Sequence, residues 1–125
     1  MARYALVVMA EHGEEHPGGQ GRMLHAMTAA RDLRAAGHDV SLWFHGIGVT
    51  WLTAFDVRDH KYTQHYGRLF DEIRDLIGGA CDFCASRRFG AAESAGRLAV
   101  PLVGGDGEHH TAAALIRDEW QVLTF

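Results

Sequence analysis

The chain has 125 residues, of which 47% are hydrophobic and 22% are charged, the balance of an ordinary globular domain. The formal net charge is −4 and no basic run occurs, which argues against a nucleic-acid groove. No apolar stretch approaches the roughly 20 residues of a membrane span, and residues 1–4 run straight into a strand-like segment instead of a signal peptide. We therefore expect one domain over residues 1–125, in the cytoplasm, with no nucleic-acid or membrane partner.

The first half of the chain alternates strand and helix patterns. Residues 5–10 form a short apolar run, typical of a strand buried on both faces. A polar loop is expected over residues 11–20, and then a helix whose apolar residues recur at three- and four-residue spacing until Gly37. The pattern of residues 39–44 predicts a second strand, which is followed by a turn at residues 45–48.

The middle of the chain holds the second helix and the cysteines. After a mixed connection around Trp51, an apolar stripe from Tyr66 to Ile77 predicts a helix. Gly78 and Gly79 are expected to end it. The cysteine segment, residues 81–88, follows directly and is predicted to be a short strand that turns into a short helix.

The last part of the chain is predicted to hold two strands and one helix. Residues 98–103 are a fourth strand candidate, although Pro101 cannot donate to a ladder. A loop over residues 104–107 precedes a helix over residues 111–119, with Leu115 and Ile116 expected to face inward. Residues 121–125 predict the final strand.

Strands that alternate with helices predict a parallel sheet covered by helices on both faces. The fold class is therefore α/β, with a three-layer α/β/α sandwich and a mostly parallel five-stranded sheet. In such a sheet, ligands and reactive groups gather at the carboxyl ends of the strands. The cysteine segment and the loops that hold His12, His45 and His109 are all expected at that edge.

The order and spacing of five segments resemble the DsrE/DsrF-like family, which includes sulfur-relay proteins of the DsrE and TusD type and YchN-like proteins. The segments, which together span nearly the whole chain, are residues 5–9, 36–40, 45–49, 81–85 and 122–125. The resemblance implies a three-layer α/β/α domain that assembles as a homo-oligomer or with related subunits. It also implies that Cys81 matches the cysteine that carries sulfur as a persulfide in sulfur-relay members, and that Cys84 matches a second cysteine found in many members.

The Cys81-x-x-Cys84 motif is the candidate reactive site. A thiol accepts sulfur only as a thiolate, which the first turn of a helix favours and which Asp82 disfavours. Arg87 and Arg88 are close enough in sequence to compensate for that charge. Two cysteines at this spacing can also close a disulfide. We therefore expect sulfur relay or thiol redox chemistry through a persulfide or a disulfide, with no organic cofactor, in a sulfurtransferase or a sulfur carrier that meets a sulfur donor or acceptor protein.

Two other functions remain open at this point. The first is a non-catalytic oligomeric protein that binds a small ligand or has a regulatory role, and its cysteines are structural. Cys81, Cys84 and histidines hold a metal in the second, because Cys-x-x-Cys is half of a zinc site. No second Cys-x-x-Cys completes that site, so no metal is predicted. His12, His45, Arg87, Arg88 and His109 are expected to line the cleft at the strand ends.

Overall fold

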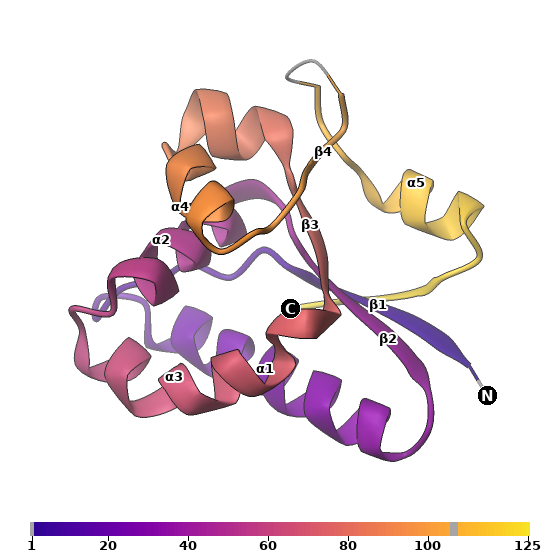
Figure 1. The fold of residues 1–125 in the computed structure, drawn as a ribbon, viewed down its shortest axis with the longest axis horizontal. Helices are drawn as coiled ribbons and strands as arrows, with labels where there is room; N and C mark the ends of the chain where they lie inside the picture. The colour runs from indigo at the N-terminus through magenta and orange to yellow at the C-terminus, as the bar shows by residue number, and fades with distance from the viewer. Residues whose placement is uncertain (1, 106–107) are drawn as a thin grey trace.

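The structure is a computed structural model that describes residues 2–105 and 108–125. A sheet runs through the middle of the molecule, with helices packed against it (Figure 1). In chain order, the helices and strands are β1 (Arg3–Val8), α1 (Pro17–Ala35), β2 (Asp39–Phe44), α2 (Thr50–Val57), α3 (Lys61–Ile73), β3 (Ile77–Cys81), α4 (Ala92–Arg97), β4 (Leu102–Val103), α5 (Ala112–Arg117) and β5 (Gln121–Thr124).

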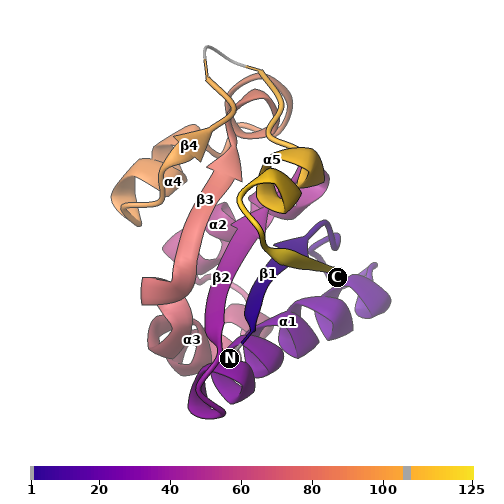
Figure 2. The same ribbon diagram turned by 90° about the vertical axis from the view of Figure 1, so that its right-hand side faces the viewer.

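The five strands form one sheet in the order β4-β3-β2-β1-β5, and all four pairs of neighbours are parallel. The predicted α/β class and five-stranded sheet are thereby confirmed, with a sheet that is parallel throughout. Val8 lies opposite Phe44, and Cys81 lies opposite Val103. Because all strands point the same way, their carboxyl ends meet at one edge of the sheet (Figure 2).

The two faces of the sheet are covered unequally. Successive strand residues point to opposite faces. Leu6 and Leu42 are fully buried in the large core beneath α1, α2, α3 and α4, while Ala5 packs toward Leu115 of α5 on the other face. Helices on both faces are consistent with the predicted three-layer sandwich. In the part of the chain that the structure describes, the only helix on the second face is the six-residue α5, and the side chains of Trp120 and His110 also pack on this side.

The helix α1 begins earlier than predicted. The expected loop over residues 11–20 ends at His16, because Pro17 occupies the first turn of the helix, where its missing N–H is harmless. Gly19 lies inside the helix, and a Cβ there would overlap the backbone carbonyl of Glu11. Gly19 therefore allows the helix to pack closely against the preceding loop.

The prediction that Gly78 and Gly79 end the second helix is wrong. The helix α3 ends at Ile73, a 3₁₀ turn follows, and both glycines lie within β3. A Cβ on Gly78 would lie 2.5 Å from the ring of Trp43, and a Cβ on Gly79 would lie 3.3 Å from it. The glycines are therefore a packing feature, since the indole of Trp43 lies directly on the backbone of the neighbouring strand.

The fourth strand is shorter than predicted and is preceded by an unpredicted helix. Only Leu102 and Val103 pair as β4, directly after Pro101. Residues 98–99 instead follow the end of α4, and Ala99 has a left-handed φ of 58°. The helix α4 escaped prediction because its small residues form no wide apolar stripe.

The C-terminal helix faces the sheet along a single narrow stripe. Leu115 is 1% exposed, whereas Ile116 is 62% exposed, so the prediction that Ile116 faces inward is wrong. The predicted loop at residues 104–107 is seen at Gly104 and Gly105, which both have positive φ; Asp106 and Gly107 lie outside the described residues. Over residues 2–105 and 108–125, no helix has the length and apolar character needed to cross a bilayer.

Candidate functional site

The two cysteines lie where β3 passes into a wide helical turn. Cys81 is the last residue of β3, and Cys84 begins a π-helix that runs to Arg88. The N–H of Phe89 donates to the carbonyl of Cys84 at 2.9 Å, which is the five-residue spacing of that turn. Single π turns of this kind are often found at functional sites.

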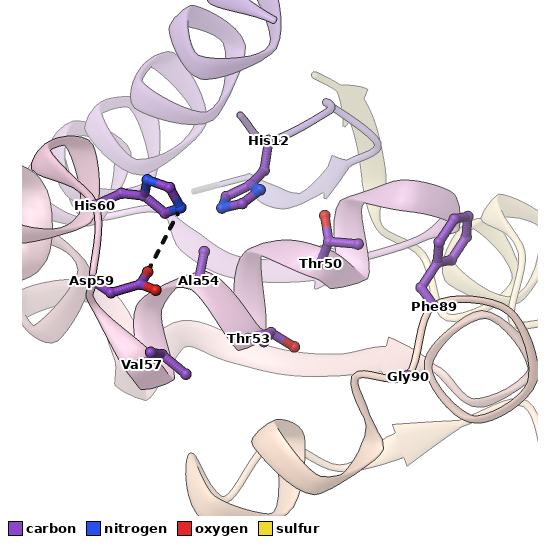
Figure 3. A pocket seen from close by; sticks show the side chains of 9 residues that line it. All are labelled: His12, Thr50, Thr53, Ala54, Val57, Asp59, His60, Phe89 and Gly90. Carbon is purple, nitrogen blue, oxygen red and sulfur yellow. Dashed lines mark ion pairs between the residues drawn. The ribbon is translucent and has the colours of Figure 1, made fainter. Parts of the chain in front are cut away.

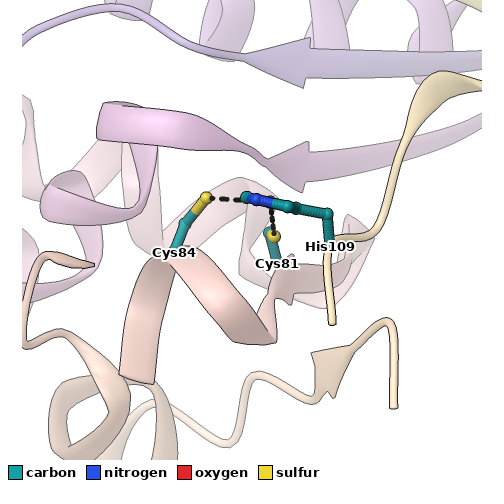
Figure 4. Close-up of side chains that lie close together, drawn as sticks. All are labelled: Cys81, Cys84 and His109. Carbon is teal, nitrogen blue, oxygen red and sulfur yellow. Dashed lines mark hydrogen bonds between the residues drawn. The ribbon is translucent and has the colours of Figure 1, made fainter. Parts of the chain in front are cut away.

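Both sulfur atoms face the same ring nitrogen. Nδ1 of His109 lies 3.5 Å from Sγ of Cys81 and 3.7 Å from Sγ of Cys84 (Figure 4). The backbone N–H of His110 also donates to Sγ of Cys81 at 3.4 Å. The site therefore joins two distant segments, since Cys84 and His109 are 25 positions apart in the sequence.

The thiols are buried beneath an exposed histidine. Cys81 is 1% exposed and Cys84 is 5% exposed, and neither forms a disulfide. His109, in contrast, is exposed, and its ring packs against Phe83 with the centroids 4.3 Å apart. A reagent that approaches from the solvent therefore meets the imidazole before it meets either sulfur.

The environment of Cys84 favours the protonated thiol. Burial raises the pKa of the Cys84 thiol, and the neighbouring Cys81 raises it further. The backbone N–H of Gly46 and the charge of Arg88 act in the opposite direction but are the smaller effects on this pKa. Cys84 is therefore held neutral beside Cys81.

Two neutral histidines, His45 and His110, contact each other next to this site. Nε2 of His45 and Nδ1 of His110 are 2.9 Å apart, and the ring of His110 stacks on Trp43 with the centroids 5.0 Å apart. Burial, followed by the proximity of His110 and His109, lowers the pKa of His45 to about 4. Burial also lowers the pKa of His110. The pair shares one proton between the two facing nitrogens and carries no charge at neutral pH.

Acid is expected to destabilise the protein through His45. Because the folded state holds the pKa of His45 at about 4, below its ordinary value of 6.5, the unfolded chain takes up the proton first as the pH falls. Stability should fall between about pH 6.5 and pH 4, by about 3 kcal/mol for this group alone. Urea unfolding of the wild type and of His45→Gln, measured across that range, checks this.

The variant His45→Gln should flatten the pH dependence but not remove it, since the pKa of His110 is also lowered. His25→Gln, which changes an exposed histidine of α1, is the matched control and should follow the wild type. Parallel profiles for the wild type and His45→Gln would contradict this role of His45.

The two predicted arginines lie on the solvent side of the π-helix. Arg87 and Arg88 are exposed, and the guanidinium of Arg88 lies 5.4 Å from the ring centre of Phe89. Arg88 also favours the thiolate of Cys84. Asp82 accepts a hydrogen bond from Ser86 at 2.7 Å on the same turn.

His12 lies in a separate pocket of about 390 Å³ (Figure 3). Its ring meets Trp51 edge-on at 5.1 Å and His60 at 5.7 Å, and His60 pairs with Asp59 at 3.7 Å. The lining residues are His12, Thr50, Thr53, Ala54, Val57, Asp59, His60, Phe89 and Gly90. Of the histidines expected at the cleft, His109 therefore contacts both sulfurs, His45 contacts the neighbouring His110, and His12 lies in another pocket.

Sequence reasoning missed three groups that complete these sites. The backbone N–H groups of Gly46 and His110 reach the two sulfurs, and backbone groups leave no residue-type signal. His60 lies beside His12, and only the fold brings together these two positions, which are 48 residues apart.

The fold and the site define an α/β protein whose parallel sheet carries a buried pair of thiols at its carboxyl edge. A sequence model of the DsrE/DsrF-like family matches residues 6–125. The chain therefore belongs to the DsrE/DsrF-like family, and the resemblance noted in the sequence is confirmed. A search of curated proteins and a search of solved structures found no match. Family membership supports a sulfur-relay type of protein in general terms.

Proposed function

We propose that this protein handles sulfur through its thiols, with Cys81 accepting a sulfur atom as a persulfide and Cys84 acting as the second thiol. One observation carries the proposal: Sγ of Cys81 accepts the N–H of His110 and lies 3.5 Å from Nδ1 of His109. An N–H donor stabilises a thiolate, and a neutral imidazole nitrogen can take the thiol proton. The raised pKa of Cys84 makes this thiol a poor nucleophile at neutral pH.

The transfer is thiolate chemistry that needs no external oxidant. The Cys81 thiolate attacks the outer sulfur of a donor persulfide, the S–S bond of the donor breaks, and the donor leaves as a thiolate. Cys81 then carries the sulfur as a persulfide. An acceptor thiolate that attacks this outer sulfur takes it away and regenerates the Cys81 thiolate.

Cys84 offers a second fate for the persulfide. Its sulfur lies within 4.8 Å of that of Cys81, close to the same imidazole. When Cys84 attacks Sγ of Cys81, the Cys81–Cys84 disulfide forms and the outer sulfur leaves with the thiol proton as hydrogen sulfide. A dithiol of this type can therefore either pass sulfur on or release it and become oxidised.

Donor and acceptor are expected to reach the thiols from the carboxyl edge of the sheet, where the exposed His109 must move aside. A cytoplasmic setting, in which thiols stay reduced, suits this chemistry. Assembly as a homo-oligomer or with related subunits is also part of the proposal. The face of the sheet that the short helix α5 covers is a surface on which such a subunit can pack.

Incubating the reduced protein with a cysteine desulfurase and its substrate tests the proposal. We expect the intact mass to rise by about 32 Da, the mass of one sulfur atom, and peptide mapping to place it on Cys81. An unchanged mass, while both thiols remain open to alkylation, would refute sulfur transfer.

Small-ligand binding is the second candidate function, and the pocket beside His12 favours it. Its volume of about 390 Å³ lies within the range of small-molecule sites, and histidine, threonine and apolar side chains line it. In that case the thiols are structural. Cysteines that take up no sulfur and resist alkylation until the protein is denatured would favour this function over sulfur transfer.

A further inference from the structure

We infer that Sγ of Cys81, Sγ of Cys84 and Nδ1 of His109 form a zinc-binding site with three protein ligands and an open fourth position. The three atoms lie within 4.8 Å of one another. They come from the end of β3, from the π-helix and from the segment before α5 (Figure 4). The inference is independent of sulfur transfer, although both would use the same thiols.

The two distances from the imidazole to the sulfurs fit tetrahedral zinc. With Zn–S bonds of about 2.3 Å and a Zn–N bond of about 2.0 Å, the tetrahedral angle separates a sulfur and a nitrogen ligand by about 3.5 Å. The two observed distances from Nδ1 of His109 to the sulfurs are 3.5 and 3.7 Å. Both nitrogen–sulfur distances therefore match the separation expected between two ligands of one zinc ion.

Hydrogen bonding alone accounts poorly for this arrangement. An imidazole nitrogen has either one proton or one lone pair, directed in the plane of the ring, so it makes one good hydrogen bond. Here two sulfurs share the same nitrogen at nearly equal distances. A cation among the three atoms interacts favourably with all of them at once.

Neighbouring groups hold the three ligands in place. The ring of His109 packs on Phe83, with the centroids 4.3 Å apart, which fixes the direction of Nδ1. The N–H of His110 reaches Sγ of Cys81, and the N–H of Gly46 favours the thiolate of Cys84. Outer partners of this kind orient metal ligands and offset thiolate charge.

The ligand set selects the metal and leaves one position open. Two thiolates and an imidazole suit Zn²⁺ and disfavour Mg²⁺ or Ca²⁺, and binding displaces the two thiol protons. His45 and His110 bond to each other at 2.9 Å, so their side chains are already engaged. Among the described residues, no fourth Cys, His, Asp or Glu joins the cluster. An open position is the feature of zinc sites that bind a substrate or water.

Titration of the reduced, untagged protein with Co²⁺ and then Zn²⁺ tests the inference. Co²⁺ should give thiolate-to-metal charge-transfer bands and the strong visible absorption of a tetrahedral site, which saturates at one ion per chain. Zn²⁺ should abolish both signals and remain bound through gel filtration at one ion per chain. Absence of the charge-transfer bands would overturn the inference.

Single substitutions identify the ligands. His109→Ala changes an exposed side chain and should weaken Zn²⁺ binding by about 100-fold or more, as should Cys81→Ser and Cys84→Ser. His12→Ala, in the separate pocket, is the matched control and should bind as the wild type does. Wild-type affinity in His109→Ala, with its fold verified by circular dichroism, would overturn the three-ligand site. A wild-type protein that gives the Co²⁺ spectra but takes up no sulfur would refute the proposed function and leave the zinc site standing.

Discussion

Cys81→Ser is expected to reduce persulfide formation to background, whereas Cys84→Ser is expected to keep it and to prolong the life of the persulfide. Cys81 is the sulfur that accepts the N–H of His110, and a serine hydroxyl in its place is not ionised at neutral pH. Cys84 is held as a thiol by its raised pKa, so its loss should leave the first attack intact. Its loss also removes the attack that closes the disulfide and releases sulfide.

The two variants are matched, because both change a buried sulfur to oxygen within the same four residues. Intact mass after reaction with a cysteine desulfurase reports the added sulfur, and a time course of released sulfide reports its fate. We expect sulfide release from the wild type and almost none from Cys84→Ser. A persulfide that persists in Cys81→Ser and disappears in Cys84→Ser would reverse the two roles and contradict the proposed mechanism.

The sheet was predictable because its signals are local. The strand predicted over residues 39–44 matches the observed ends of β2, and the alternation of strands and helices identified the parallel arrangement. One failure came from glycines, whose positions depend on tertiary packing. Its position in the sequence predicts that Gly78 ends a helix, but Gly78 lies in a strand, where Trp43 packs on it.

The candidate site was predictable in its cysteines and in its position at the carboxyl edge of the sheet. The four-residue motif is local, and the edge follows from the order of the elements. What the sequence does not contain is the choice of partners. His109 and His12 were both expected at this edge, but only His109 contacts the sulfurs, because that contact depends on where two distant loops pack.

Gly48→Ala is expected to destabilise the protein by more than about 3 kcal/mol, above the usual cost of an added methyl group in a packed region. A Cβ on Gly48 would overlap the carbonyl oxygen of Val8 and would lie 3.1 Å from Cα of Met9. These are backbone atoms at the end of β1, so no flexible side chain can move to make room. The strain would be relieved only if the 3₁₀ turn Gly46–Val49 shifts away from the sheet.

Gly21→Ala is the matched control, because no atom lies within 4 Å of its added Cβ and the residue is in the interior of α1. That variant should be stabilised by about 0.5–1 kcal/mol through its higher helix propensity. Urea unfolding of both variants measures the change in the free energy of unfolding, which should decrease for Gly48→Ala and increase for Gly21→Ala. A shift of the turn in Gly48→Ala would also withdraw the N–H of Gly46 from Cys84, so native-state alkylation of Cys84 should change with stability. Equal stability of Gly48→Ala and the wild type would mean that the turn does not lie against β1 as closely as the structure places it.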